Sequence, residues 1–281
     1  MKRKKIKKLK LVGGLRLLPK DERDFQLGNI VKLPKLEDLP ESYLVETLGV
    51  NKQDSSDFCA AFATCTASET QEGIELEPTY TFALSKELSG DPDDWGQDLR
   101  TMCKSHTKIG AIEKKDSPYN LSNKDTDFLR RIENWPPELK NKAAIHRKQS
   151  YFKITGPYSH FDNIRASLFY YKTPIVIGVI WSWPLEDVFM EDFKEEGFGH
   201  AVTVCGWIKV EEKTYLIIQN SYGASVGRQG FHYFSRKIID AMIDKFGAFC
   251  FIDLPRETAE TMNKWKIKWR WLAAILAKIK F

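Results

Sequence analysis

The spacing of apolar residues divides the chain into a helical first half and a strand-rich second half. Small and apolar side chains recur at three- and four-residue spacings in segments that predict helices at residues 57–71, 79–88, 97–107 and 161–171. Short apolar runs predict strands at residues 174–180, 200–210, 213–220, 227–236 and 247–254. Helices followed by strands indicate an α+β protein with two lobes.

The two ends of the chain differ from this body. The first ten residues, MKRKKIKKLK, hold seven basic residues, and prolines at 19, 34 and 40 interrupt the segment that follows. Near the other end, tryptophan and isoleucine alternate with lysine and arginine from residue 265 onward. We therefore divide the chain into an irregular basic arm (residues 1–40), one large domain (41–255) and a basic, Trp-rich tail (256–281).

The charge of the two ends suggests partners, although simpler interpretations exist. The arm and the tail are candidates for contact with a membrane surface, an acidic partner or a larger assembly. The alternatives are a disordered, solvated arm and a tail that docks on the body. There is no specific nucleic-acid motif, and the apolar run at residues 271–277 is far shorter than the roughly 20 residues of a membrane span. Arg16 and Pro19 interrupt the stretch that a secretory signal would keep apolar.

The five cysteines are odd in number and scattered, without a CxxC pair or a Cys/His ligand spacing. This pattern argues against a disulfide scaffold and a structural zinc site, so we expect no metal, no cofactor and a reducing compartment. We therefore expect a cytoplasmic protein, with peripheral membrane or particle association as the alternative. One group of cysteines and histidines lies in no recognisable motif and is interpreted as structural: Cys65, Cys103, Cys205, Cys250, His106, His146, His160 and His232.

Three short blocks carry the candidate chemistry. QDSSDFCAAFA places Cys59 at a predicted helix start with Gln53 six residues before it, GFGHAVTVCGW places His200 at the start of a strand, and QNSYGASVGRQGF places Asn220 in a glycine-rich turn. A thiol of ordinary pKa, about 8.5, is mostly protonated at neutral pH. A helix N-terminus and a neighbouring imidazolium both favour the thiolate.

In this order and spacing the blocks resemble the papain-like cysteine peptidases. About 140 residues separate Cys59 from His200, within the roughly 130–150 typical of that family. The resemblance covers roughly residues 40–255. It implies a helical N-terminal lobe, a strand-rich, barrel-like C-terminal lobe and an active site in the cleft between them, with a protein or peptide substrate.

The resemblance also implies a role for each residue. Cys59 would attack the carbonyl carbon, and His200 would protonate the leaving amine and then activate water. Asn220 would orient the imidazole, and Gln53 would donate to the oxyanion together with the Cys59 N–H. Residues expected to line the cleft are Phe58, Gly178, Gly199 and Tyr222.

The chain departs from the family pattern beside the nucleophile. Ser56 replaces a cysteine that usually forms a disulfide, Asp57 replaces a glycine, and Phe58 replaces a serine. Asp57 would either point inward and oppose the thiolate or cap the helix and point away. The glycine-rich segment that lines the substrate backbone is not recognisable near residues 95–96, which puts the usual strand pairing of an extended peptide in question.

These observations predict thiol-dependent hydrolysis of peptide or isopeptide bonds. Two alternatives use the same fold: a catalytically inactive binding or structural module, and an amidase or acyl transferase with the same Cys-His-Asn site. A further hypothesis makes the terminal segments the main functional parts, as anchors to a membrane or an assembly.

Overall fold

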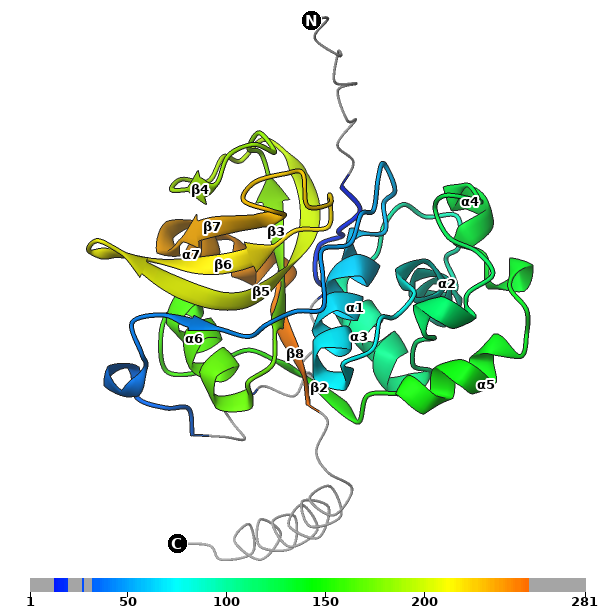
Figure 1. Ribbon diagram of the computed structural model, residues 1–281, viewed down its shortest axis with the longest axis horizontal. Helices are drawn as coiled ribbons and strands as arrows, with labels where there is room; N and C mark the ends of the chain where they lie inside the picture. The colour runs from blue at the N-terminus through cyan, green and yellow to red at the C-terminus, as the bar shows by residue number, and fades with distance from the viewer. Residues whose placement is uncertain (1–12, 20–26, 28–31, 253–281) are drawn as a thin grey trace, which may run out of the picture.

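The computed structural model describes residues 13–19, 27 and 32–252. Two lobes lie side by side, one rich in strands and one made mainly of helices (Figure 1). The predicted roles of the basic residues 1–10 and of the Trp-rich tail at 256–281 fall outside the described residues. Within those residues, no helix is long and apolar enough to cross a membrane.

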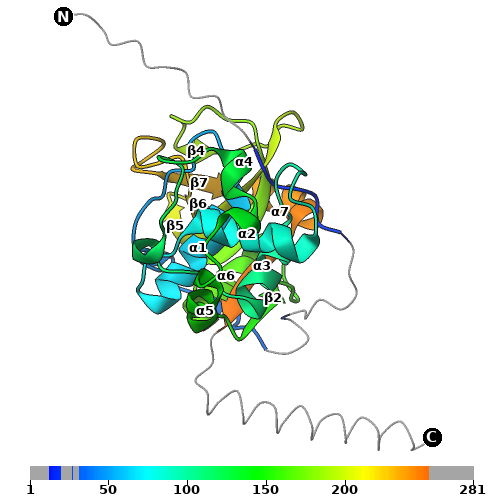
Figure 2. The same ribbon diagram turned by 90° about the vertical axis from the view of Figure 1, so that its right-hand side faces the viewer.

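The helical lobe is built around three helices, which Figure 2 shows gathered on one side of the molecule. They are α1 (Cys59–Glu72), α2 (Pro78–Ser89) and α3 (Leu99–Lys108), with the short α4 (Thr126–Leu129) and α5 (Leu139–Ala143) beside them. Local sequence fixes their ends. The Glu77 carboxylate accepts from the Thr79 N–H and Pro78 opens α2, while Asp98 caps α3 by accepting from Thr101 N–H. Short 3-10 turns complete the connections at Leu36–Asp38, Lys114–Asp116, Ile132–Asn134 and Ala144–His146.

The second lobe contains one sheet with the strand order β2-β8-β3-β5-β6-β7-β4, and β1 pairs with β5 outside that path. The strands are β1 (Tyr43–Leu44), β2 (Ser150–Lys153), β3 (Ile175–Trp181), β4 (Phe189–Met190), β5 (Phe198–Val210), β6 (Lys213–Gln219), β7 (Phe231–Ser235) and β8 (Ala248–Ile252). All pairs are antiparallel except β4 with β7. Helices α6 (His160–Tyr171) and α7 (Arg236–Phe246) belong to this lobe.

Helix α1 joins the two lobes. Its residues 59–69 are all buried, and the Thr203 hydroxyl of β5 donates to the Ala63 carbonyl at 3.0 Å. The small side chains of α1, which are alanine, cysteine, serine and threonine, allow this close approach of helix and sheet. The buried start of α1 therefore lies where the lobes meet.

The two-lobed α+β fold predicted from the sequence is confirmed. The four predicted helices and five predicted strands correspond to α1, α2, α3, α6, β3, β5, β6, β7 and β8. Helix α7 was not predicted, although its buried residues Ile238, Ile239, Met242, Ile243 and Phe246 recur at spacings of three and four. That signal was available in the sequence.

Candidate active site

Cys59 is the first residue of α1, and its side chain is buried. The backbone N–H of Ala60 hydrogen-bonds the sulfur, as expected for a group at a helix N-terminus. Two further backbone N–H groups, those of Ala201 and Gly14, do the same from other segments. The thiol therefore lies at the positive end of a helix dipole, inside a ring of backbone donors.

His200 lies on β5, where it is paired with Val179 of β3. Its Nε2 lies 2.9 Å from Asn220 Oδ1, and its ring stacks on Tyr222 with centroids 4.9 Å apart and planes inclined by 10°. Its Nδ1 has no hydrogen-bond partner among the described residues. Asn220 and Tyr222 thus fix the ring while one nitrogen stays available for proton transfer.

Asn220 follows β6 and is itself held by a histidine that the sequence analysis assigned no role. His232 Nδ1 lies 2.8 Å from the Asp187 carbonyl, so this nitrogen carries the proton and Nε2 is an acceptor. His232 Nε2 lies 3.3 Å from Asn220 Nδ2. Because His232 Nε2 accepts a hydrogen bond from the Asn220 side-chain NH2, the side-chain oxygen of Asn220 faces His200.

Gln53 is fully buried, and its side-chain amide is oriented by two neighbours. Its Nε2 donates to the Ser56 carbonyl at 2.9 Å, and its Oε1 accepts from the Ser221 hydroxyl at 2.5 Å. An amide NH2 has two hydrogens, so one donor remains after the Ser56 bond. Gln53 can therefore supply an oxyanion donor from a fixed position.

Burial sets the protonation states of the thiol and the imidazole. It raises the pKa of the Cys59 thiol to about 11, against the lowering effect of the backbone N–H donors, and the Asp57 carboxylate adds to the rise. Burial also lowers the pKa of His200 to about 4, although the hydrogen bond to Asn220 favours the imidazolium. In this arrangement both groups are neutral at pH 7.

Residues 13–19 of the chain, which we call the strap, contribute to this burial. The strap lies between the lobes, beside α1 (Figure 1). Leu15 N–H donates to the Gly199 carbonyl at 3.1 Å on the strand side, and Arg16 N–H donates to the Gln97 carbonyl at 3.2 Å on the helical side. Gln97 N–H in turn donates to the Gly14 carbonyl at 2.8 Å. The strap is thus an extended peptide bound across both lobes beside Cys59.

The side chain of Leu15 packs in an apolar site on the strand side. A Cβ added at Gly178 would lie 2.4 Å from Leu15 Cδ2 and 2.3 Å from Phe246 Cβ, and one added at Gly199 would lie 2.3 Å from the Leu15 carbonyl oxygen. Both glycines are therefore required for this close approach.

A family model described as papain family cysteine protease matches residues 40–247. The chain belongs to the papain family of cysteine proteases. It is a thiol hydrolase that cleaves peptide bonds, as the sequence analysis predicted. Among curated proteins no sequence matches the chain.

Solved structures of papain-family proteins share the fold. Xylellain, a cysteine protease from Xylella fastidiosa, is 17% identical, covering 89% of this chain and 100% of its own, with a TM-score of 0.69. Digestive procathepsin L 3 from the larval midgut of Tenebrio molitor is 16% identical over 87% of this chain and 78% of its own, with a TM-score of 0.66. Bromelain from Ananas comosus, in complex with the E64 inhibitor, is 18% identical over 76% and 99%, with a TM-score of 0.56.

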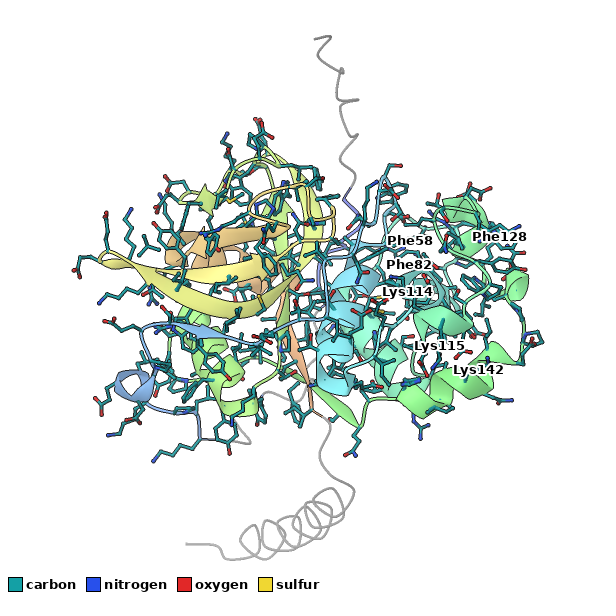
Figure 3. All side chains as sticks on the ribbon, viewed as in Figure 1. Phe58, Phe82, Lys114, Lys115, Phe128 and Lys142 are labelled. Atoms are coloured by element: carbon teal, nitrogen blue, oxygen red, sulfur yellow. The ribbon has the colours of Figure 1, made fainter. Side chains whose placement is uncertain are left out.

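Most of the residues proposed for the papain-family site lie together, but Phe58 does not. Its ring is fully buried and stacks on Phe82 at 4.1 Å within the helical lobe (Figure 3), so the expectation that it lines the cleft is wrong. Tyr222, Gly178 and Gly199 do lie at the site. No group of three or more His, Cys, Asp or Glu side chains able to hold a metal ion occurs in the described part of the chain.

Asp57 does not cap α1, but its carboxylate opposes the thiolate, the other effect considered from the sequence. Phe58, not Asp57, is the N-cap residue of α1, and the Asp57 carboxylate accepts from Gly96 N–H at 2.6 Å and pairs with Arg130 at 3.0 Å. Neither this contact nor the contact of His232 with Asn220 can be predicted from the sequence, because the partners meet only in the folded chain.

Proposed function

We propose that Cys59, His200 and Asn220 are the catalytic residues, with Gln53 and the Cys59 N–H as oxyanion donors. The observation that carries this proposal is one hydrogen-bonded network that joins separate sequence blocks beside the start of α1. Ser221 Oγ donates to Gln53 Oε1 at 2.5 Å and Ser221 N–H donates to Asn220 Oδ1 at 2.8 Å. Asn220 Oδ1 in turn lies 2.9 Å from His200 Nε2.

In this proposal each group has a function along the reaction. Once the strap has left, the Cys59 thiol gives its proton to His200, and the thiolate forms a bond to the substrate carbonyl carbon. The oxyanion accepts from Gln53 Nε2 and the Cys59 N–H. The imidazolium of His200 protonates the leaving amine as the C–N bond breaks. His200 then takes a proton from water, whose oxygen attacks the thioester and releases the acid and the free thiol.

The strap occupies the position of a substrate without presenting a bond for cleavage. Gly14 offers its N–H to the Cys59 sulfur, while its carbonyl accepts from Gln97. The Gly13 carbonyl accepts from Trp95 Nε1 at 2.6 Å. Neither carbonyl is held by the oxyanion donors, so the strap must leave before a substrate is cut.

The site of Leu15 indicates the substrate that would replace the strap. An extended peptide with a large aliphatic side chain would fill the apolar space against Phe246 and pair with the backbone of Gln97 and Gly199. Arg16 of the strap pairs with Asp91, which favours a basic residue next to the aliphatic one. Isopeptide bonds remain within the proposal because the site requires only an acyl group in extended conformation.

The experiment that tests the function compares the full chain with Leu15→Asp and Leu15→Asp/Cys59→Ala variants on a peptide library with aliphatic and basic residues. A charge placed in the apolar site should displace the strap. We expect new termini in the products with Leu15→Asp and none with the double variant. Products that join two peptides would indicate acyl transfer, and a double variant as active as Leu15→Asp would contradict the role of Cys59.

We also propose a reducing, cytoplasmic location. All five cysteines are free and buried, as expected in a reducing compartment. Membrane or particle association through the basic arm or the tail remains a proposal based on their charge and tryptophan content. Localisation of the full chain and of a chain ending at residue 255 would test both statements.

A further inference from the structure

The backbone that pairs with the strap on the helical side is an irregular turn, residues 94–97. Three of its backbone groups bind the strap: the N–H and carbonyl of Gln97, and the Trp95 carbonyl, which accepts from Arg16 Nε at 2.7 Å. Three others are held from behind by charged side chains. Asp57 accepts from Gly96 N–H at 2.6 Å, and Lys86 Nζ donates to the carbonyls of Asp94 and Gly96, both at 2.7 Å.

Arg130 connects these groups. It pairs with Asp57 at 3.0 Å, donates to the Asp94 carbonyl at 3.3 Å, and its guanidinium lies 5.9 Å from the centre of the Trp95 ring. Asp57 is 0% exposed, Lys86 0% and Arg130 4%. Three charged side chains from separate segments are thus buried together under one four-residue turn.

Burying charges in this way is costly unless each one has partners. Here each charge fixes a backbone group of the same turn. We infer that Asp57, Arg130 and Lys86 are positioning residues that hold the Gln97 backbone as a peptide-binding edge. The inference rests on the proposed function, because the edge would hold a substrate backbone as it holds the strap.

Glycines at the contact allow the strap to approach the turn closely. A Cβ on Gly96 would lie 1.9 Å from the Gly14 carbonyl oxygen, and a Cβ on Gly14 would lie 1.8 Å from the Asp57 carbonyl oxygen. The turn, the backbone of Asp57 and the strap are therefore in direct contact. A shift of the turn by a fraction of an ångström would change the fit of the peptide.

The test replaces Asp57 and Arg130 together, so that neither side chain remains as a buried charge without the other. We compare wild type, Asp57→Ala/Arg130→Met and Asp57→Asn/Arg130→Met, all in the full chain. Asparagine keeps an acceptor for the Gly96 N–H, so it should restore much of what alanine loses. The matched control is Asp162→Ala/Arg165→Met. This ion pair, in which Arg165 Nη1 lies 3.1 Å from Asp162 Oδ1, belongs to the other lobe. Thermal unfolding checks that each variant is folded.

The first readout is the rate at which iodoacetamide alkylates Cys59, located by peptide mass spectrometry. In Asp57→Ala/Arg130→Met the peptide-binding edge should hold the strap less tightly, so the strap should dissociate from the site more often. The rate of Cys59 alkylation should then rise about tenfold. Adding Leu15→Asp should abolish the difference, because the strap is then displaced in every variant. A difference that persisted would mean that removing Asp57 acts on the thiol itself, and would overturn the inference.

The second readout is peptide hydrolysis in the Leu15→Asp background. We expect KM to rise about tenfold with kcat within twofold for the alanine variant, and a smaller rise for the asparagine variant. Unchanged KM and alkylation rates, a fall in kcat alone, or the same changes in the control pair would each overturn the inference. If no variant hydrolyses peptides, the proposed function fails, while the alkylation rates still decide whether the three residues support the edge.

Discussion

The two sides of the active site are built by different means. On the strand side, Gly199, His200 and Ala201 belong to β5 and pair in register with residues 178–180 of β3. On the helical side, the facing backbone is the turn at residues 94–97, held by buried side chains rather than by a neighbouring strand.

This difference separates chemistry from binding. The regular sheet positions the imidazole, where an error of one residue in register would move His200 to the opposite face. The irregular turn positions only a peptide backbone, and its support by side chains from distant segments can change without disturbing the sheet. Substitution of His200 should therefore affect kcat, and substitution of the side chains that hold the turn should affect peptide binding.

The largest effect is expected from His200→Ala, which removes the proton donor and acceptor of the strand side. In the Leu15→Asp background kcat should fall by about 1000-fold or more. Steady-state kinetics on the preferred peptide measures this loss. The matched control is His232→Ala, which should retain more activity because His232 acts through Asn220. A kcat within tenfold of the parent in His200→Ala would remove His200 from the mechanism.

A smaller loss of kcat is expected from Gln53→Ala. Gln53 lies at the junction of the two sides. Removing one oxyanion donor should lower kcat by about 100–1000-fold and leave KM nearly unchanged. The same kinetic assay separates the two parameters. If KM rose instead while kcat stayed constant, Gln53 would hold the ground-state peptide and not the oxyanion.

The free energy of unfolding should depend on pH through a buried histidine of the helical lobe. His106 of α3 is buried with neither ring nitrogen hydrogen-bonded to another described residue, and burial lowers its pKa to about 3. The unfolded chain binds a proton near pH 6.5, so stability falls as the pH drops from about 6.5 toward 3, by about 2 kcal/mol at pH 5. His106→Phe, which keeps a ring against Phe251, should remove this part of the dependence.

Urea unfolding at pH 7 and pH 5 measures the effect. His200 adds a dependence of the same sign, since burial lowers its pKa as well. The His106→Phe variant should therefore retain some loss at pH 5, but less than wild type. Equal losses in both proteins would show that His106 is protonated in the folded state.

The smallest effect is expected from alanine substitution of two glycines on the helical side, Gly96 and Gly90. Gly96 has φ +62° and Gly90 has φ +70°, so alanine at either position is strained by about 1 kcal/mol. Only at Gly96 would the added Cβ also meet the strap, because nothing lies within 4 Å of a Cβ at Gly90. Gly96→Ala should raise the rate of Cys59 alkylation about tenfold, while Gly90→Ala should lower stability alone. Equal alkylation rates would contradict the backbone contact at Gly96.

The same contrast explains what could be predicted from the sequence. Strands and helices with regular apolar spacing, and the three blocks around Cys59, His200 and Asn220, are local patterns, so the fold and the strand side follow from the sequence. Helix α7 was missed although its spacing is regular.

The support of the helical side could not be predicted, because nothing local connects its residues. Asp57, Lys86 and Arg130 are brought together only by the packing of α1, α2 and the segment after α4. Phe58 was misplaced for a related reason: the residue before the nucleophile faces Phe82 of the helical lobe. Which way a side chain points at a helix start depends on tertiary packing that a single sequence does not show.

The most direct test is the rate of Cys59 alkylation by iodoacetamide between pH 4 and 9, compared in wild type, Leu15→Asp and Leu15→Asp/His200→Ala. The strap keeps the thiol buried and neutral, so wild type should react slowly and speed up only at high pH. Leu15→Asp should react rapidly already near pH 5–6, and the added His200→Ala change should abolish that reactivity. Identical profiles for wild type and Leu15→Asp, or a profile independent of His200, would contradict a thiol–imidazole site covered by the strap.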